Sequence, residues 1–289
     1  MGKSQEQPMA GQESHRLTFR IRNHDLKDPV RTVDVLATPE EIRQIVEKGY
    51  LVREKMFTGE GLERLRRALD EVEAKEKDIH GMGEGMNRSR NYGGLFLRHL
   101  MDKHPVFLEL LKFQPILSVA RALIGPQVQV RGMTARISYP NEPHQETHWH
   151  FHQRVIPDPV PPFFTRPHVI DALIYLDETN DANGPVCVLP GTHLKPDTDL
   201  PSDDWSDKPG QVVLRLSAGS CVIMHSSLWH RAFPTTPQGS RRRLLLLGYG
   251  SPWLKPSIYG EKPKNGLTEK LLKDADSETR ELLGLEGYM

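Results

Sequence analysis

A change in hydrophobic periodicity near Gln127 constrains the fold more than any other feature. Before it, apolar residues recur at helical spacing; after it, they alternate with a period of two, as in strands. The expected strands are separated by Pro, Gly and Asn or Asp turns, and they span 128–139, 168–176, 186–189, 211–216, 220–224 and 242–249. Helices first and strands later predict a mainly β core with flanking helices packed outside it.

The first half of the chain carries helix signals. Thr38-Pro-Glu-Glu41 predicts a helix start with a capping box, and Gly49 predicts its end, followed by a short strand at 50–52. Further helices are expected at about 61–75, 104–124 and 268–283. The domain prediction is a disordered tail at 1–14 and one domain at 15–289, with a helical part to about 126, a β core at about 127–255 and a C-terminal helix.

Charge and composition narrow the classes of partner. Lys+Arg and Asp+Glu both number 38, so no general basic field is present to attract nucleic acid or acidic lipid. Cys187 and Cys221 both lie in apolar runs, which favours buried free thiols and a reducing compartment. No run approaches about 18 apolar residues, and the N-terminus lacks an apolar signal core. We therefore expect a cytoplasmic protein without a membrane or nucleic-acid partner; the sequence leaves its oligomeric state open.

A row of histidines between residues 139 and 152 carries most of the chemical information. His144, Glu146, His148, His150 and His152 occupy every second position, so in an extended chain they share one face. At about 3.3 Å per residue the row spans roughly 26 Å, so only a neighbouring pair can bind one ion. The pairs that include a carboxylate are His144/Glu146 and Glu146/His148.

A candidate third ligand lies downstream, where His230 follows the apolar stretch 221–224. Two histidines and one carboxylate on one face of an octahedral ion leave three open positions, which suits a non-haem Fe(II) oxygenase. A structural zinc site would normally be closed by four ligands and use thiolates, and the chain has only two cysteines. The alternative is that histidines flanked by Trp and Phe are ordinary core or groove residues.

Three arginines, 241–243, lead directly into an apolar strand. Alternation puts Arg241 and Arg243 on one face and Arg242 on the other. An inward arginine near a metal is costly unless it pairs with an anion, which a dicarboxylate cosubstrate would supply to the guanidinium fork. The alternative is a solvated basic corner at the start of a strand.

Three segments together resemble the phytanoyl-CoA dioxygenase-like branch of the Fe(II)/2-oxoglutarate oxygenases. They are His144-Gln-Glu146; the turn at 177–193, close to that family's D-x-T-x-x-N-G-P…P-G-S/T-H pattern; and Trp229-His230, followed eleven residues on by Arg241. The opening at 38–52 is also similar, so the resemblance covers most of 38–260. It implies a double-stranded β-helix (jelly-roll, cupin-like) core. His193, which ends the second segment, is expected at the surface or near the metal rather than on it.

The resemblance makes His144, Glu146 and His230 the iron ligands and Arg241 the partner of the distal carboxylate of 2-oxoglutarate. Thr134 and Arg136 fall where relatives place further contacts to cosubstrate or substrate, and Arg243 is a further candidate. The family usually has Asp where this chain has Glu146, which keeps the charge and argues against the halogenase variant that lacks the carboxylate. Whether a neighbouring histidine competes with Glu146 for the metal stays open.

The implied activity uses Fe(II), 2-oxoglutarate and O2 to oxidise an unactivated C–H bond of a small organic molecule, with release of succinate and CO2. Hydroxylation is the expected outcome, and natural-product metabolism is one setting for it. His148, Trp149, His150 and Phe151 would wall the substrate side, with the 80–95 and 155–167 loops. Two other classes stay open: a cupin-like metalloenzyme that uses several histidines and no 2-oxoglutarate, and a non-catalytic relative of the fold.

Overall fold

Two antiparallel sheets face each other in the computed structural model, which describes residues 13–20, 30–81, 94–153, 157–196, 198, 204–255 and 265–285. The larger sheet has the order β3-β10-β7-β12-β5-β4, with β3 (Tyr50–Arg53), β10 (Cys221–His225), β7 (Val169–Tyr175), β12 (Arg242–Gly250), β5 (Gln129–Ser138) and β4 (Leu95–Leu97). The smaller has the order β6-β11-β8-β9, with β6 (Thr147–His150), β11 (His230–Ala232), β8 (Val186–Val188) and β9 (Val212–Leu214). A separate hairpin pairs β1 (His15–Arg20) with β2 (Val30–Val35).

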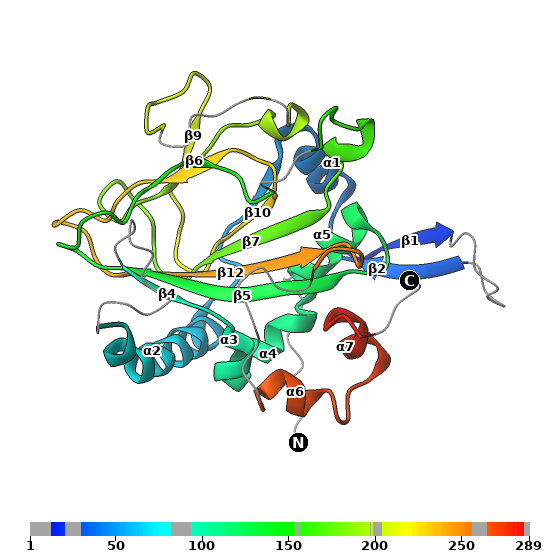
Figure 1. Ribbon diagram of the computed structural model, residues 1–289, viewed down its shortest axis with the longest axis horizontal. Coiled ribbons are helices and arrows are strands. Elements are labelled where there is room, and N and C mark those ends of the chain that lie inside the picture. The colour runs from blue at the N-terminus through cyan, green and yellow to red at the C-terminus, as the bar shows by residue number, and fades with distance from the viewer. Residues whose placement is uncertain are drawn as a thin grey trace.

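Helices lie mainly on the side of the larger sheet that faces away from the smaller one (Figure 1). They are α1 (Pro39–Lys48), α2 (Gly59–Gly81), α3 (Leu100–Lys103), α4 (Pro105–Glu109), α5 (Gln114–Ile124), α6 (Leu267–Leu271) and α7 (Ser277–Leu282). The described residues also form the short 3-10 helices η1 (Leu110–Lys112), η2 (Pro162–Thr165) and η3 (Thr192–Leu194). The helices and the larger sheet together enclose the main hydrophobic core.

The other face of the larger sheet lines the space between the two sheets, which we call the interior. Strand alternation separates the two faces: Leu245 and Leu247 of β12 pack toward the helices, whereas Leu244 and Leu246 face the interior. The interior core also contains Leu173 and Tyr175 of β7, Val186 and Val188 of β8, and Val222 and Met224 of β10. A strand residue can therefore be assigned to the interior from its place in this alternation.

The six predicted strands correspond to β5, β7, β8, β9, β10 and β12, with ends that differ by at most two residues. The helix expected at 104–124 is divided into α4, η1 and α5, because Pro115 starts a new helix in its second half. The closing helix is also two helices, since Asp276 caps α7 by accepting a hydrogen bond from the Thr279 amide at 2.8 Å. Most of the predicted tail at 1–14 and of the loop at 80–95 lies outside the described residues.

The start of α1 confirms the predicted capping box. The Thr38 hydroxyl accepts from the Glu41 amide at 3.2 Å, and the Glu41 carboxylate accepts from the Thr38 amide at 2.9 Å. Glu41 also forms an ion pair with the buried Arg53 of β3 at 2.7 Å, so the cap joins the helix to the larger sheet.

We expect Thr38→Ala to lower the free energy of unfolding by about 1 kcal/mol, because the Glu41 amide loses its acceptor. Urea denaturation followed by circular dichroism measures the change. Thr38→Ser, which keeps the hydroxyl, should lose less than half as much. An equal loss in the two variants would mean that the methyl group, and not the hydrogen bond, is responsible.

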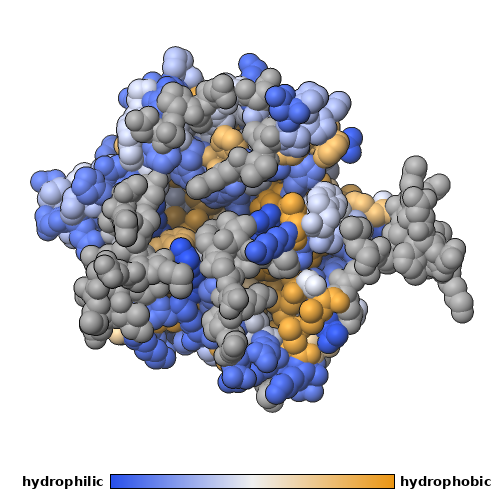
Figure 2. All heavy atoms as spheres, in the orientation of Figure 1, coloured by the Kyte–Doolittle hydropathy of each residue, from blue (hydrophilic) through white to orange (hydrophobic). Residues whose placement is uncertain are grey.

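Cys187 and Cys221 are both buried and free, as predicted. In the part of the chain that the structure describes, no helix combines the length and apolar character needed to cross a membrane. Hydrophilic side chains cover much of the described surface on the face seen in Figure 2.

Candidate metal centre

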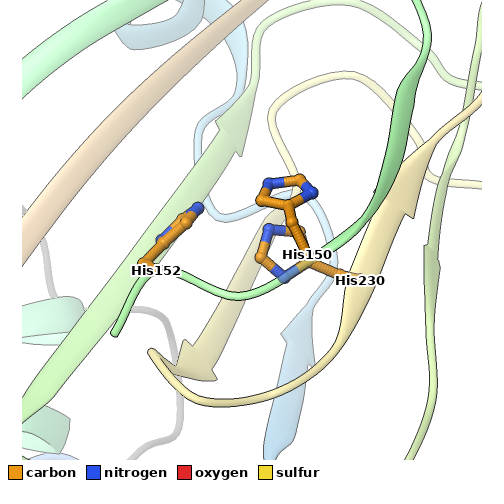
Figure 3. A group of neighbouring side chains, drawn as sticks. All are labelled: His150, His152 and His230. Atoms are coloured by element: carbon orange, nitrogen blue, oxygen red, sulfur yellow. The ribbon is translucent and has the colours of Figure 1, made fainter. Parts of the chain in front are cut away.

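Three histidines meet at one end of the smaller sheet (Figure 3). The potential ligand atoms of His150, His152 and His230 all lie within 4.8 Å of one another. His230 of β11 is opposite His150 of β6 in the antiparallel pairing, and His152 lies two residues past His150. His230 is also opposite Val188 on its other side, and the Val188 side chain belongs to the interior core. Directly opposed residues share a face, so this group faces the interior.

Hydrogen bonds fix the tautomer of each ring. Nδ1 of His150 lies 2.8 Å from the His148 carbonyl oxygen, and Nδ1 of His230 lies 2.9 Å from the Leu228 carbonyl oxygen. A carbonyl oxygen only accepts, so both Nδ1 atoms carry the proton and both Nε2 atoms keep a free lone pair. Nδ1 of His152 lies 2.8 Å from a carboxylate oxygen of Asp171, which assigns the same tautomer. Three Nε2 atoms are therefore available to one ion.

Burial keeps two of these rings neutral. Burial, together with the neighbouring His152 ring, lowers the pKa of His230 to about 3. Burial and the adjacent His230 and His152 rings also hold the pKa of His150 well below its ordinary value. A neutral imidazole is the form that binds a metal, so these rings do not need to lose a proton first.

The structure does not bring His144 and Glu146 together with His230. His144 is exposed at a φ of 58° in the turn before β6, and Glu146 also precedes that strand. Among the described residues, the one group of three or more potential ligands contains neither of them. The neighbouring pair that lies beside His230 is His150 and His152, further along the same row, because β6 pairs with β11 at His150.

Arg241 and Arg243 point away from the interior. Arg241 forms ion pairs with Asp70 and Glu73 of α2. Arg243 pairs with Asp177 at 2.7 Å and with Asp70 at 3.0 Å. Both guanidinium groups therefore join β12 to helix α2 and to the end of β7, on the helix side of the sheet.

Arg242 faces the interior, on the opposite side of β12 as alternation predicts. It is fully buried and donates to the Ser138 hydroxyl at 2.9 Å and to the carbonyl oxygens of Asn183 and Gly184. These acceptors are all neutral, and its Nε finds no hydrogen-bond partner among the described residues. Burial lowers the pKa of this guanidinium, because its charged form has lost contact with water. A bound anion would stabilise that charged form.

Thr134 and Arg136 of β5 share the interior face with Arg242. Their neighbours Met133, Ala135 and Ile137 pack on the helix side, so 134 and 136 face the other way. The Thr134 hydroxyl is buried without a partner among the described residues, and Arg136 donates to the Gln145 carbonyl at 2.8 Å. The interior thus offers polar groups that a bound anion could use.

The four predicted pocket residues divide between the two faces of the smaller sheet. His148 and His150 lie on the interior side, where the His148 ring is 5.8 Å from the His150 ring and 5.7 Å from that of Trp205. Trp149 and Phe151 belong instead to a separate outer cluster with Cys187 and Trp229. The Trp149 indole donates to the Ser206 carbonyl at 2.8 Å, so it anchors the loop after residue 203.

His193 lies outside the metal group. It is buried, its Nε2 is 2.9 Å from the Val46 carbonyl oxygen, and its ring lies 5.0 Å from that of His225. Burial lowers its pKa, so it stays neutral. The hydrogen bond joins the turn after β8 to helix α1.

Sequence comparison assigns the family. The model of the phytanoyl-CoA dioxygenase (PhyH) family matches residues 45–243, which is more than half of the chain. The chain belongs to the phytanoyl-CoA dioxygenase family. The predicted resemblance is confirmed, and with it the jelly-roll core.

Curated relatives of this PhyH-family protein are distant. A probable alpha-ketoglutarate-dependent hypophosphite dioxygenase of Stutzerimonas stutzeri is 22% identical over 77% of this chain and 83% of its own. L-Proline trans-4-hydroxylase of Streptomyces griseoviridis is 23% identical over 70% and 82%. Ectoine dioxygenase of Bordetella parapertussis is 25% identical over 58% and 54%. All three are dioxygenases or hydroxylases by name.

Solved structures share the fold of this PhyH-family chain. The non-haem alpha-ketoglutarate-dependent carbocyclase SnoK of nogalamycin biosynthesis has a TM-score of 0.58 at 19% identity, covering 76% of this chain and 87% of its own. HygX of Streptomyces hygroscopicus, solved with nickel and 2-oxoglutarate, has a TM-score of 0.59 at 16% identity, covering 76% and 89%.

Sequence reasoning missed two residues that the structure adds to the site of this PhyH-family protein. Asp171 is a single carboxylate in the otherwise apolar run 169–176, and such an isolated charge was an available signal. Arg242 had been placed by alternation on the face opposite Arg241, but nothing in the sequence said which face was the interior.

Proposed function

We propose that this protein oxidises a small organic molecule with O2 and 2-oxoglutarate, at an iron ion held by His150, His152 and His230. The observation that carries the proposal is the convergence of His150, His152 and His230 on one interior surface, with their potential ligand atoms within 4.8 Å of one another. Ligands gathered on one side of an octahedral ion leave the other positions for cosubstrate and O2, as in non-haem Fe(II) oxygenases.

The residues of the interior also fit 2-oxoglutarate. Arg242 is a buried cation that donates to neutral oxygens of Ser138, Asn183 and Gly184. Its Nε has no hydrogen-bond partner in the described part of the chain, which supports an incoming carboxylate. The Thr134 hydroxyl lies buried on the same face and has no partner among the residues that the structure describes, so it could donate to the same molecule. We therefore assign to Arg242 the role that the family resemblance gave to Arg241, with Thr134 and Arg136 as further contacts.

When iron, 2-oxoglutarate and O2 are bound, their chemistry couples release of succinate and CO2 to oxidation of a second substrate. The chain supplies placement. The three histidines hold the metal at the end of the smaller sheet, Arg242 orients the far end of the cosubstrate, and the apolar interior around Leu173, Leu244 and Met224 limits water.

The substrate class follows from the relatives and from the charge of the chain. The named relatives act on hypophosphite, ectoine or L-proline, all small molecules. The formal net charge of this chain is +0, so it has no general field for an ionic polymer. Both observations favour a small-molecule substrate, and the ectoine and L-proline enzymes favour an organic one that is hydroxylated.

The test is succinate formation by protein purified without oxygen and then given Fe(II), 2-oxoglutarate and O2. Slow turnover without the second substrate is expected in wild type, and it should disappear in His230→Ala. Titration with 2-oxoglutarate measures binding independently. If iron-loaded wild type neither forms succinate nor binds 2-oxoglutarate, the proposal fails.

A second candidate is a cupin-like metalloenzyme that uses three histidines and no 2-oxoglutarate. The absence of a carboxylate from the one potential ligand group found in the described residues favours it. This candidate predicts metal binding and O2 consumption that do not depend on 2-oxoglutarate, together with a dispensable Arg242. The same assay, run with and without 2-oxoglutarate, separates the two.

A further inference from the structure

The metal group contains three histidines and no carboxylate, whereas the common Fe(II) oxygenase site contains two histidines and one carboxylate. A carboxylate is nevertheless present beside the group, hydrogen-bonded to one of the three histidines. His150 and His230 donate their Nδ1 protons to backbone carbonyls, but His152 donates to the Asp171 carboxylate at 2.8 Å. His152 is therefore the one ligand of the three with a charged partner.

The fold makes room for this carboxylate. Asp171 lies on β7 in the row that continues with Leu173 and Tyr175, so it faces the interior from the larger sheet. Directly opposite it on β12 is Gly248, and a Cβ there would lie 3.1 Å from Asp171 Oδ1. That separation is tighter than ordinary contact, so glycine on the neighbouring strand leaves the carboxylate its space.

We propose that Asp171 is a positioning residue that takes over the charge of the carboxylate ligand by acting through His152. It holds the His152 ring with Nε2 turned toward His150 and His230. It also keeps one negative charge next to the cation without occupying a coordination position. This inference rests on the three-histidine site of the proposed function, and it adds that the two sheets are joined at the metal by the His152–Asp171 pair.

Two effects follow from this arrangement. A carboxylate that accepts from a metal-bound histidine fixes the ring and increases its basicity, and such partners are worth about tenfold to a hundredfold in metal affinity. An aspartate at position 152 has no ring N–H to donate to Asp171, so Asp171 could no longer position that ligand. The contribution of Asp171 to metal affinity should therefore be smaller when residue 152 is an aspartate, because only the attraction of its charge for the cation remains.

The experiment is a double-variant cycle with Co(II) as the probe, because it is stable in air and its visible absorption reports coordination. Dissociation constants are measured on the full-length apoprotein for wild type, Asp171→Asn, His152→Asp and the double variant. Asp171→Glu tests rescue by a longer carboxylate, and thermal unfolding of each apoprotein monitors folding.

We expect Asp171→Asn to raise the Co(II) dissociation constant about tenfold to a hundredfold in the wild-type background. Asp171→Glu should recover part of that loss. In the His152→Asp background, Asp171→Asn should raise the constant by a clearly smaller factor, because no ring is left for Asp171 to position. The proposal is overturned if Asp171→Asn raises the constant by the same factor in both backgrounds, if it has no effect on wild type, or if wild type binds no Co(II).

The result of the Co(II) binding experiment can be distinguished from the result of the succinate assay that tests the proposed function. Co(II) affinity and its dependence on residues 152 and 171 do not require 2-oxoglutarate or turnover. A protein that passes the cycle but forms no succinate would keep the metal site and lose the oxygenase assignment.

Discussion

Replacing His150 or His230 by alanine is expected to weaken iron binding by more than a hundredfold and to abolish succinate formation. Each change removes one of the three histidine ligands. Removing only the hydrogen-bond partner of a metal ligand already lowers metal affinity about tenfold to a hundredfold, so losing the ligand itself should cost more. The fold should survive, because the side-chain hydrogen bond of each ring is local, to the carbonyl of residue 148 or 228. Anaerobic Fe(II) titration against a competing chelator measures the affinity.

The matched controls are His144→Ala and Glu146→Gln, which remove the two other ligands expected from the family pattern. His144 is exposed in the turn before β6, so we expect iron affinity and succinate formation within about twofold of wild type. If these controls lose iron while His150→Ala keeps it, the metal is bound at the earlier positions of the row and the three-histidine site is wrong.

Replacing Arg242 by methionine is expected to raise the dissociation constant for 2-oxoglutarate at least about thirtyfold. Truncating one partner of a buried, hydrogen-bonded charge pair costs about 2–5 kcal/mol, and each 1.4 kcal/mol is a factor of ten. Methionine keeps an unbranched apolar chain in the interior and removes a buried cation, which offsets part of the lost hydrogen bonds to Ser138, Asn183 and Gly184. Isothermal titration of the metal-loaded protein measures the affinity.

Arg241→Gln is the control on the adjacent position. Arg241 pairs with Asp70 and Glu73 of α2, so its loss should lower thermal stability and leave 2-oxoglutarate affinity within about twofold. Arg242→Lys keeps the charge but loses the guanidinium fork, so its dissociation constant for 2-oxoglutarate should lie between those of Arg242→Met and wild type. The assignment fails if Arg241→Gln weakens 2-oxoglutarate binding while Arg242→Met does not.

Local features were predictable because local interactions decide them. The capping box at Thr38 and Glu41 depends on residues three apart, and the six strands depend on alternation within each segment. The three-residue strands β4 and β11 were not predicted, and their backbone pairing with β5 and β8 holds them in place.

The row of histidines shows where sequence reasoning stops. Alternation correctly placed His148, His150 and His152 on one face, and it limited the metal to a neighbouring pair. Which pair meets His230 depends on the register between β6 and β11, where His230 faces His150. Register is a long-range property, and a shift of two residues along the row would select different ligands without changing the face.

The sequence by itself determined the family, the jelly-roll class, the histidine-rich face and the separation of Arg242 from its two neighbours. Tertiary structure decided which of the histidines and arginines lie at the site. It brought Asp171 of the larger sheet to His152 beside the smaller one, and it turned Arg242 inward while α2 paired with Arg241. The physical reason is that face and periodicity are set within a strand, whereas strand register and sheet packing are set by contacts between distant segments.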